Sequence, residues 1–520
     1  MTTNAEFAES QRERREKFHE ADVVVVGAGV FGCAAAYALA NQGRSVLLLE
    51  RSMSEPDRIV GELLQPGGVR SLRKLGLERC TEGIDAIPCY GYHVLNFDQE
   101  VVIPYSYVDE DGRVHAQSHK MTDGPNGHHA AVANGSAKKA DLKRPEGRSF
   151  HHGRFIMKLR EACLAHPNIT VVETEVTATI TGDAGPAVLG VESLTTVDRE
   201  TREKRPDYFF GQLTIIADGY ASKFRKQYVG RAPVVRSKFY ALELIDCPLA
   251  PAGYGHVVIG KAAPILIYQI GARETRALIA VPNDLPAASP AAGGVRGYIR
   301  NVVLPNLPPA VRPCFEAALA DGRIPRSMPN SWLPPARDAI GSHPGVVVLG
   351  DAYNMRHPLG GGGMTVAFND VLLVAELLDP ARVPDLGDAD AVRAALRPFH
   401  WRRKSLSSII NVLAQALYSL FEAQDRQLMA LRRGCFRYFQ LGVTDEPVAM
   451  LGGLVHQPLM LARHFFTVAF LAVWVNAVDV VCGGNVVLGL LRSPLVLVDA
   501  VLILWKACVV FLPVLYRELL

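Results

Sequence analysis

The segment DVVVVGAGVFGCAAAYALANQGRSVLLLE, residues 22–50, decides the fold that this sequence predicts. It begins with an apolar β-branched run, continues with three glycines among small residues, and ends with a second apolar run. The two apolar runs are nearly continuous, which is typical of strands buried on both faces of a parallel sheet. The small residues between them favour a helix that ends near Gly43. The segment therefore predicts a β-α-β unit.

The three glycines, Gly27, Gly29 and Gly32, form a GxGxxG motif between the first strand and the helix. In this motif the first glycine permits the tight turn, the second lets a pyrophosphate approach the backbone, and the third permits close packing of the helix. Glu50 ends the second strand, where a carboxylate accepts hydrogen bonds from an adenosine ribose. That carboxylate would repel the 2′-phosphate of NADP, so the motif predicts FAD or NAD. Glycines in an ordinary turn would lack this surrounding pattern.

Two later stretches share a design that favours FAD. IIADGYASKFR (215–225) and VVVLGDAYNMRHPLGGGGM (346–364) each end an apolar strand with an aspartate, Asp218 and Asp351. Such an aspartate can accept hydrogen bonds from the ribityl chain of FAD, and glycines at the following helix start let the backbone approach the isoalloxazine. A helix N-terminus there favours the negative charge that a reduced flavin carries near N1 and C2=O. A glycine-rich helix entry with a capping aspartate is the alternative interpretation.

Composition limits the classes of protein that fit. With 520 residues, 49% of them hydrophobic, the chain is long enough for two or three units with buried cores. The 55 basic and 52 acidic residues are spread along the chain and give a formal net charge of +3, so we expect no nucleic-acid partner. Nine cysteines are scattered without a CxxC pair, which favours reduced, cytosol-facing thiols over disulfides or a zinc site.

The predicted fold class is α/β: a Rossmann-type FAD-binding domain, a second mixed or antiparallel sheet for the substrate, and a C-terminal helical, membrane-associated region. The expected units are a polar N-terminal tail (1–21), a first part of the FAD-binding domain (22–235) with an insertion (109–148), the substrate sheet (236–325), a second part of the FAD-binding domain (326–400) and the helical region (401–520). The insertion is polar and aperiodic, so we interpret it as flexible. We interpret its His128 and His129 as solvated rather than metal-binding, because no acidic or cysteine partner stands at ligand spacing.

Two apolar stretches near the C-terminus, residues 464–482 and 495–515, are about long enough to cross a membrane. Each carries two polar residues on one helix face: Asn476 with Asp479, and Asp499 with Lys506. Hydrocarbon on all sides would not readily accommodate these groups, so we expect a hairpin, 464–515, that dips into one leaflet. A spanning pair and a soluble buried hairpin are the alternatives. The helices are expected to be bracketed by Pro458, Pro494 and Pro513.

The three cofactor motifs, in this order, resemble those of FAD monooxygenases related to p-hydroxybenzoate hydroxylase. The stretches between them resemble, more specifically, the squalene monooxygenase (squalene epoxidase) family, from about Asp22 to the C-terminus. They are EPDRIVGELLQPGG (55–68), GRSFHHGRFIMKLR (147–160), LIYQI (266–270), RSMPNSWLPP (326–335) and NVLAQALYSLF (411–421).

The resemblance implies a reaction. FAD, reduced with NADPH-derived electrons from a diflavin reductase, would capture O2 as a C4a-hydroperoxide and epoxidise squalene to (S)-2,3-oxidosqualene for sterol biosynthesis. It implies a place on the endoplasmic reticulum or microsomal membrane, with the catalytic domain facing the cytosol and membrane lipid at the mouth of a long apolar pocket. Two alternatives keep an apolar ligand: an FAD-dependent isoprenoid-lipid reductase of the geranylgeranyl type, and a non-enzymatic carrier of prenylated proteins.

The resemblance also assigns residues. Tyr92 and Gln65 match the pair beside the reactive centre of the family, in which the tyrosine hydroxyl orients the glutamine; neither is expected to act as an acid or base, because the flavin supplies the oxygen-transfer chemistry. Gly360 stands where the family usually has threonine, which could loosen the flavin loop. From the motifs and the resemblance together, the candidate cofactor residues are Gly27, Gly29, Val30, Phe31, Gly32, Glu50, Arg51, Arg58, Arg160, Asp218, Asp351, Gly363 and Met364.

Overall fold

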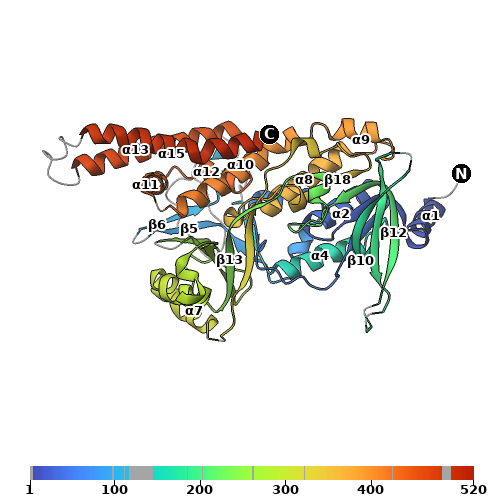
Figure 1. Cartoon of the computed structure of the whole chain (residues 1–520), viewed down its shortest axis with the longest axis horizontal. Helices are drawn as coiled ribbons and strands as arrows, with labels where there is room; N and C mark the ends of the chain where they lie inside the picture. Colours follow the sequence, from blue (N-terminus) through green and yellow to red (C-terminus); the bar gives the residue numbers. More distant parts are fainter. Residues whose placement is uncertain are drawn as a thin grey trace, which may run out of the picture.

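The computed structural model of the chain shows two large sheets side by side and a layer of helices along one edge of the molecule (Figure 1). It describes residues 4–96, 99–109, 112–115, 144–183, 185–198, 200–201, 203–260, 263–320, 322–423, 425–482 and 493–519. Most of the predicted insertion, from 116 to 143, lies outside the described residues, and so do His128 and His129.

The predicted β-α-β unit is confirmed as β1 (Glu20–Val26), α2 (Val30–Asn41) and β2 (Val46–Glu50). The parallel part of the first sheet has the strand order β10-β2-β1-β12-β18. Its other strands are β10 (Ile169–Thr181), β12 (Lys204–Ile216) and β18 (Val346–Val348), and β11 (Val188–Thr196) pairs antiparallel with the long β10 and β12. Because β1, β12 and β18 run parallel, the three cofactor motifs that follow them meet at one edge of the sheet.

Helices pack against this sheet. The helices α2, α4 (His152–Leu164) and α8 (Gly363–Leu377) contact one another, and the valines of β1 are almost fully buried beneath them. Before β1, the expected polar tail forms a helix, α1 (Asn4–Lys17). Its Arg15 is only 2% exposed and donates to the Pro167 carbonyl oxygen (2.7 Å) and to Thr170 (3.1 Å). The N-terminal segment is therefore fixed to the sheet although its sequence is polar.

The second sheet is confirmed and has seven strands in the order β17-β13-β16-β15-β14-β5-β6. They are β5 (Gly91–Asn96), β6 (Gln99–Pro104), β13 (Val234–Ile245), β14 (Gly255–Ile259), β15 (Ile265–Gln269), β16 (Glu274–Pro282) and β17 (Arg326–Trp332). All neighbours are antiparallel except β14 and β5. The strands β5, β6 and β17 come from segments that the sequence pattern placed in the FAD-binding domain, because a strand pattern does not identify its pairing partner.

Shorter elements connect these layers. The helical ones are α3 (Pro66–Lys74), α5 (Arg225–Tyr228), α6 (Gly294–Tyr298), α7 (Arg312–Ala318) and α9 (Ala389–Leu396). The short strands are β3 (Leu63–Leu64), β4 (Ile87–Cys89), β7 (Tyr107–Val108), β8 (Val114–His115) and β9 (Gly147–Ser149). The three strands β3, β9 and β4 form a small sheet that carries the segment around Gln65 toward the second sheet.

The C-terminal region is helical, as predicted. It contains α10 (Phe399–Phe421), α11 (Arg426–Gln440), α12 (Asp445–Leu451), α13 (Pro458–Cys482) and α15 (Ser493–Leu519). The helices α13 and α15 lie side by side as a hairpin (Figure 1) and contact α11. Pro458 and Pro494 stand in the first turns, but Pro513 lies inside α15, so the prediction that it brackets the helix is wrong. A proline removes only one donor from the helix, and α15 continues past it.

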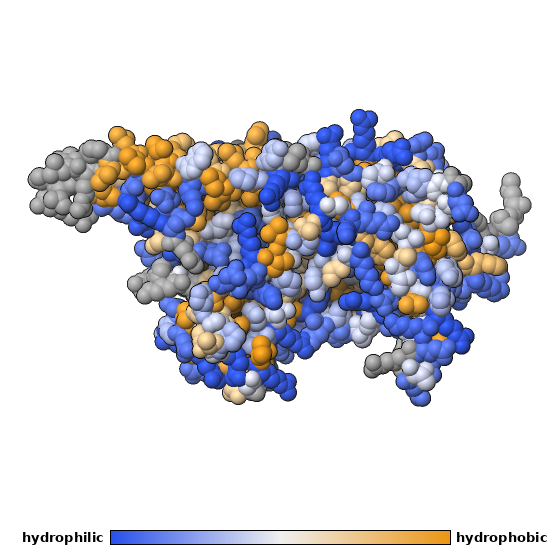
Figure 2. All heavy atoms as spheres, viewed as in Figure 1, coloured by the Kyte–Doolittle hydropathy of each residue, from blue (hydrophilic) through white to orange (hydrophobic). Residues whose placement is uncertain are grey.

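The polar residues of the hairpin lie near charged side chains of α11 and of Asp425 just before it. Arg433 of α11 donates to Asn476 (3.3 Å) and lies 3.9 Å from Asp479. Lys506 forms an ion pair with Asp425 (2.7 Å), and Asp499 with Arg426. The opposite face is apolar and open to solvent: Trp474, Leu497 and Trp505 are each at least 67% exposed. Figure 2 shows hydrophobic residues gathered along the hairpin. Both helices are long and apolar enough to cross a membrane.

Candidate active site

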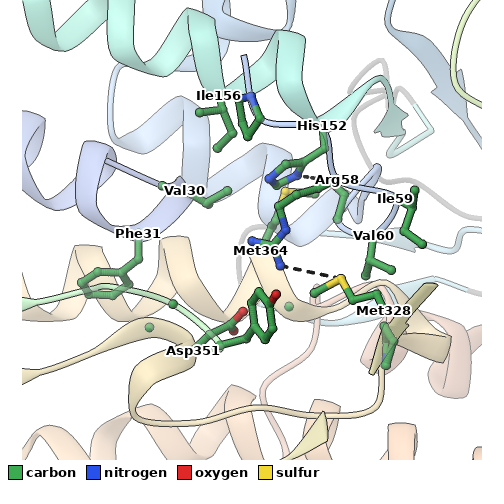
Figure 3. Close-up of a pocket in the computed structure, with 18 of the residues that line it drawn as sticks. Val30, Phe31, Arg58, Ile59, Val60, His152, Ile156, Met328, Asp351 and Met364 are labelled. Atoms are coloured by element: carbon green, nitrogen blue, oxygen red, sulfur yellow. Dashed lines mark hydrogen bonds between the residues drawn. The ribbon is translucent and has the colours of Figure 1, made fainter. Parts of the chain in front are cut away.

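A cavity of about 910 Å³ lies where the carboxyl ends of β1, β12 and β18 meet the second sheet. Figure 3 shows Val30, Arg58, Met328 and Asp351 around this one space, contributed by segments far apart in the sequence. Of the candidate cofactor residues, all but Gly32 line the cavity. The fold thus brings together residues that were selected from separate motifs.

The three glycines of the GxGxxG motif differ in what requires them. Gly27 has φ +100°, and a Cβ there would lie 2.6 Å from the Ala217 carbonyl oxygen. A Cβ on Gly32 would lie 1.8 Å from the Gly27 carbonyl oxygen. Gly29 lines the cavity, and a Cβ there would meet nothing within 4 Å. The protein itself therefore requires glycine at Gly27 and Gly32, whereas Gly29 keeps space open at the N-terminus of α2.

Glu50 and Arg160 shape the loop beyond the glycines. The Glu50 carboxylate accepts the backbone N–H of Ala28 (2.7 Å) and of Ser52 (3.2 Å). Buried Arg160 donates from Nε to the Ala28 carbonyl oxygen and from Nη1 to that of Ser54, each at 3.0 Å. Its Nη2 lies 3.6 Å from Glu50. Arg160 thus holds the cavity wall through protein carbonyls as well as lining the cavity.

Asp218 and Asp351 occupy equivalent places at two strand ends. One carboxylate oxygen of Asp218 accepts the backbone N–H of Lys223 (3.0 Å), while the other is buried without a hydrogen-bond partner among the described residues. Burial raises the pKa of Asp218. Arg225 joins the two motifs, because its guanidinium donates to the carbonyl oxygens of Asp351 (3.2 Å) and Ala352 (3.0 Å). The sequence contained Arg225 within a motif but gave no signal of this linking role.

The residues present fit an FAD molecule. Two buried polar atoms of residues that line the cavity, Asp218 Oδ1 and Arg58 Nε, have no hydrogen-bond partner in the part of the chain that the structure describes. They offer an acceptor for hydroxyl groups and a donor for phosphate or carbonyl oxygens. Together with the open space at Gly29 and the start of α8, they match the polar parts of a dinucleotide.

A buried hydrogen-bond network holds Gln65 at the far side of the cavity. Gln65 Nε2 donates to the hydroxyl of Tyr92 (2.5 Å) and to the Gly360 carbonyl oxygen (2.8 Å). Its Oε1 accepts the hydroxyl of Tyr105 (2.6 Å). Tyr92 lines the cavity, whereas fully buried Gln65 lies behind it. Burial raises the pKa of both tyrosines, so they stay protonated at neutral pH.

Tyr105 is a site residue that the sequence did not reveal. It follows the β6 strand, whose pairing with β5 brings it beside Tyr92, with the two rings 5.7 Å apart. Gly360, the departure from the usual threonine, contributes only its backbone carbonyl to this network. The network therefore joins the second sheet directly to the glycine-rich loop before α8.

His152 is a second such residue. Its Nδ1 lies 2.8 Å from the carbonyl oxygen of Gly61, which only accepts hydrogen bonds, so Nδ1 carries the proton. Burial and the charge of Arg58 lower the pKa of His152 to about 3, so the ring is neutral at physiological pH. Apolar residues of the second sheet, such as Val257, Leu266 and Leu278, form the main part of one wall of the cavity.

Comparisons with known proteins match the chain over nearly its whole length. A family model described as squalene epoxidase matches residues 210–486, and one described as FAD dependent oxidoreductase matches residues 22–255. The squalene epoxidase ERG1 of Gibberella zeae is 61% identical over 511 residues, which is 98% of each chain. The squalene epoxidase erg1 of Aspergillus fumigatus is 50% identical, over 99% of this chain and 97% of its own. The squalene monooxygenase of Mus musculus is 39% identical, over 96% and 78%.

Solved structures share the fold at lower identity. The p-nitrophenol 4-monooxygenase PnpA from Pseudomonas putida is 18% identical with a TM-score of 0.58, over 83% of this chain and 97% of its own. The flavin-dependent brominase Bmp2 is 14% identical with a TM-score of 0.59, over 86% and 98%. These likenesses confirm the predicted α/β fold class of FAD-dependent oxidoreductases.

Proposed function

The chain belongs to the squalene epoxidase family, whose members use FAD, and on that premise we propose that it epoxidises squalene to (S)-2,3-oxidosqualene in sterol biosynthesis. The electrons come from NADPH through a diflavin reductase, and the oxygen atom comes from O2. One observation carries the proposal: a single cavity has dinucleotide-type residues at one end and an apolar wall from the second sheet at the other. A cofactor and a hydrocarbon therefore have room in one space.

The residues of the chain have defined roles in this proposal. Gly29 and the N-terminus of α2 bind the pyrophosphate, and Glu50 binds the adenosine ribose. Asp218 and Asp351 bind the hydroxyl groups of the ribityl chain. Arg58 donates through its unpaired Nε. FAD, when bound, supplies the oxygen-transfer chemistry that no side chain of the protein can provide.

The remaining side chains position the alkene and exclude water. Tyr92 forms part of the wall at which cofactor and hydrocarbon meet, and Gln65 with Tyr105 fixes the orientation of its ring. Their raised pKa values keep both phenols neutral, so this wall carries no charge beside the alkene. An enclosed apolar wall keeps water from competing with the alkene for the activated oxygen.

The test is an oxygen-labelling assay on the full chain in lipid vesicles with FAD, a diflavin reductase, NADPH, 18O2 and squalene. The expected product is heavier than squalene by one 18O atom. A product that gains hydrogen but no oxygen would identify an isoprenoid-lipid reductase instead. A protein that stays colourless after incubation with FAD would identify a carrier without flavin chemistry.

The hairpin of α13 and α15 attaches the enzyme to the membrane from one side, in this proposal to the cytosolic face of the endoplasmic reticulum. Two features support one-sided insertion: the polar residues of both helices contact α11, and the apolar face is exposed along the length of the hairpin. A spanning pair would need its polar face covered within the membrane. Because squalene dissolves in lipid, this attachment places the cavity near its substrate.

Substituting exposed tryptophans on the hairpin tests membrane attachment without disturbing the fold. Replacing Trp474 and Trp505 together with serine removes two large side chains that are 68% and 67% exposed, so the protein should fold normally. We expect the affinity for phospholipid vesicles, measured by co-sedimentation, to fall at least tenfold, since each buried aromatic contributes roughly 1.5–3 kcal/mol. The matched control is Trp401→Ser, which removes a 47% exposed tryptophan from α10 outside the hairpin. Equal vesicle binding by the double variant and the control would contradict the hairpin as the membrane anchor.

A further inference from the structure

The end of α15 carries a carboxylate that is fully buried in the protein. Glu518 has no exposed surface, although it lies at the end of a helix whose outer face is open. Its Oε2 accepts from Lys404 Nζ (3.0 Å) and its Oε1 accepts from Asn411 Nδ2 (2.9 Å). Both partners lie on α10. Burying a carboxylate is costly unless it is paired, so this arrangement suggests a specific role for the group.

Asn411 connects Glu518 to the glycine-rich loop through hydrogen bonds. Its Oδ1 accepts from Arg356 Nε at 2.7 Å. Arg356 Nη2 donates to the side chain (2.8 Å) and to the backbone oxygen (3.0 Å) of Asn354. Arg356 also lines the cavity, and its Nη1 lies 3.4 Å from the Gly363 carbonyl oxygen, at the start of α8. Two hydrogen bonds therefore separate Glu518 from the guanidinium that ties Asn354 to Gly363.

Glu518 and Arg356 together fix which end of the Asn411 amide faces which partner. Asn411 has one accepting and one donating end, and it is fully buried. While its Nδ2 donates to the carboxylate, its Oδ1 must face Arg356. Arg356 has no carboxylate within 4.0 Å among the residues that the structure describes, so the amide oxygen of Asn411 is a principal acceptor for its charge. Without an acceptor at position 518, the Asn411 amide keeps Arg356 and the Asn354 side-chain oxygen (3.2 Å from Nδ2), but it loses its shorter Nδ2 contact, the one to a charged acceptor.

Contacts with Trp332 and with α10 hold the C-terminal end of α15 in place. The Arg517 guanidinium lies 5.0 Å from the centre of the Trp332 ring, and Phe511 packs in an apolar cluster with Ile409 of α10. Figure 1 shows the C-terminus beside α10, at the opposite end of α15 from Ser493. Glu518 therefore reaches its buried position only when the hairpin of α13 and α15 packs against α10.

We propose that Glu518 is a positioning residue for the FAD site: through Asn411 it holds Arg356, and Arg356 holds the loop from Asn354 to Gly363 in the conformation that binds FAD. Docking of the hairpin and affinity for FAD are thereby linked. This inference rests on the proposed function, because it requires that FAD binds at this loop.

Two double variants isolate the hydrogen bond from the charge. Lys404→Met with Glu518→Gln removes both charges but keeps an amide oxygen that can accept from Asn411. Lys404→Met with Glu518→Leu removes the same charges and the acceptor. We expect the dissociation constant for FAD, measured by flavin fluorescence on the full chain in detergent, to stay within about threefold of wild type for the glutamine pair and to rise about tenfold for the leucine pair. The visible spectrum of the bound flavin should change only in the leucine pair.

Further variants keep the test decisive. Asp246→Asn breaks an exposed ion pair with Arg273 at the edge of the second sheet, away from α10 and α15, so it should leave FAD affinity unchanged. If the leucine pair does not fold, Glu518→Met with Lys404→Met gives a straight side chain of similar length with no strong acceptor. Equal FAD affinity in the accepting and non-accepting pairs would overturn the inference. Absence of FAD binding by the wild-type chain would instead overturn the proposed function.

Discussion

Gly29→Val is expected to lower the affinity for FAD about 100-fold while the apoprotein folds as the wild type does. The backbone at Gly29 is extended (φ −89°, ψ −166°), a conformation that β-branched residues adopt readily. A Cβ there meets no protein atom within 4 Å, so the new side chain would occupy only cavity space. That space is where the pyrophosphate would contact the first turn of α2.

The measurement is a pair of titrations, one of FAD binding and one of thermal unfolding of the apoprotein. The expected result separates the two, with weak FAD binding and an unchanged unfolding temperature. Gly43→Ala is the converse control: Gly43 lies outside the cavity with φ +86°, so alanine should lower stability by about 1 kcal/mol without changing the affinity for FAD. Wild-type affinity in the Gly29→Val variant would show that the cofactor lies elsewhere.

Local patterns in the sequence predicted the cofactor end of the site because the residues that form it are local. A buried strand, a glycine turn and a helix follow one another within residues 22–50, and each is specified by its own composition. The rule that parallel strands end at one edge then brings Asp218 and Asp351 to the same cavity. Twelve of the thirteen candidate cofactor residues, which were chosen from the motifs and the resemblance together, line that cavity.

The opposite wall depended on contacts that no local pattern encodes. Tyr105 reaches Gln65 only because β5 and β6 pair and then join β14 in parallel. The Arg356 guanidinium is held by Asn411, and Asn411 by Glu518, across more than a hundred residues of chain. The polar N-terminal segment likewise forms a helix because Arg15 is buried against residues before and within β10. Such contacts depend on tertiary packing, which single-sequence periodicity does not report.

Gln65→Leu is expected to lower the rate of epoxide formation at least 100-fold while FAD remains bound. Leucine has a volume similar to that of glutamine, but it removes every hydrogen bond of the Gln65 side chain. The Tyr105 hydroxyl and the Gly360 carbonyl oxygen each lose a buried partner, at a cost of roughly 1–3 kcal/mol for each group. Tyr92 loses the donor that orients its ring, and the loop at Gly360 loses its contact with the second sheet.

Product analysis distinguishes a positioning role from a failure of cofactor binding. Bound flavin, measured by absorbance after gel filtration, should stay near the wild-type level, whereas the ratio of epoxide formed to O2 consumed should fall and hydrogen peroxide should rise. Tyr105→Phe removes the bond to Gln65 Oε1 but leaves both Nε2 bonds of Gln65, so it should lose less activity than Gln65→Leu. Gln65→Glu keeps an acceptor for Tyr105, but while it is ionised it cannot donate to the Gly360 carbonyl oxygen. If the hydrogen bond to Gly360 contributes most of the effect, the activity of this variant should lie close to that of the leucine variant. Wild-type coupling of O2 consumption to epoxide in Gln65→Leu would show that the wall does not depend on this network.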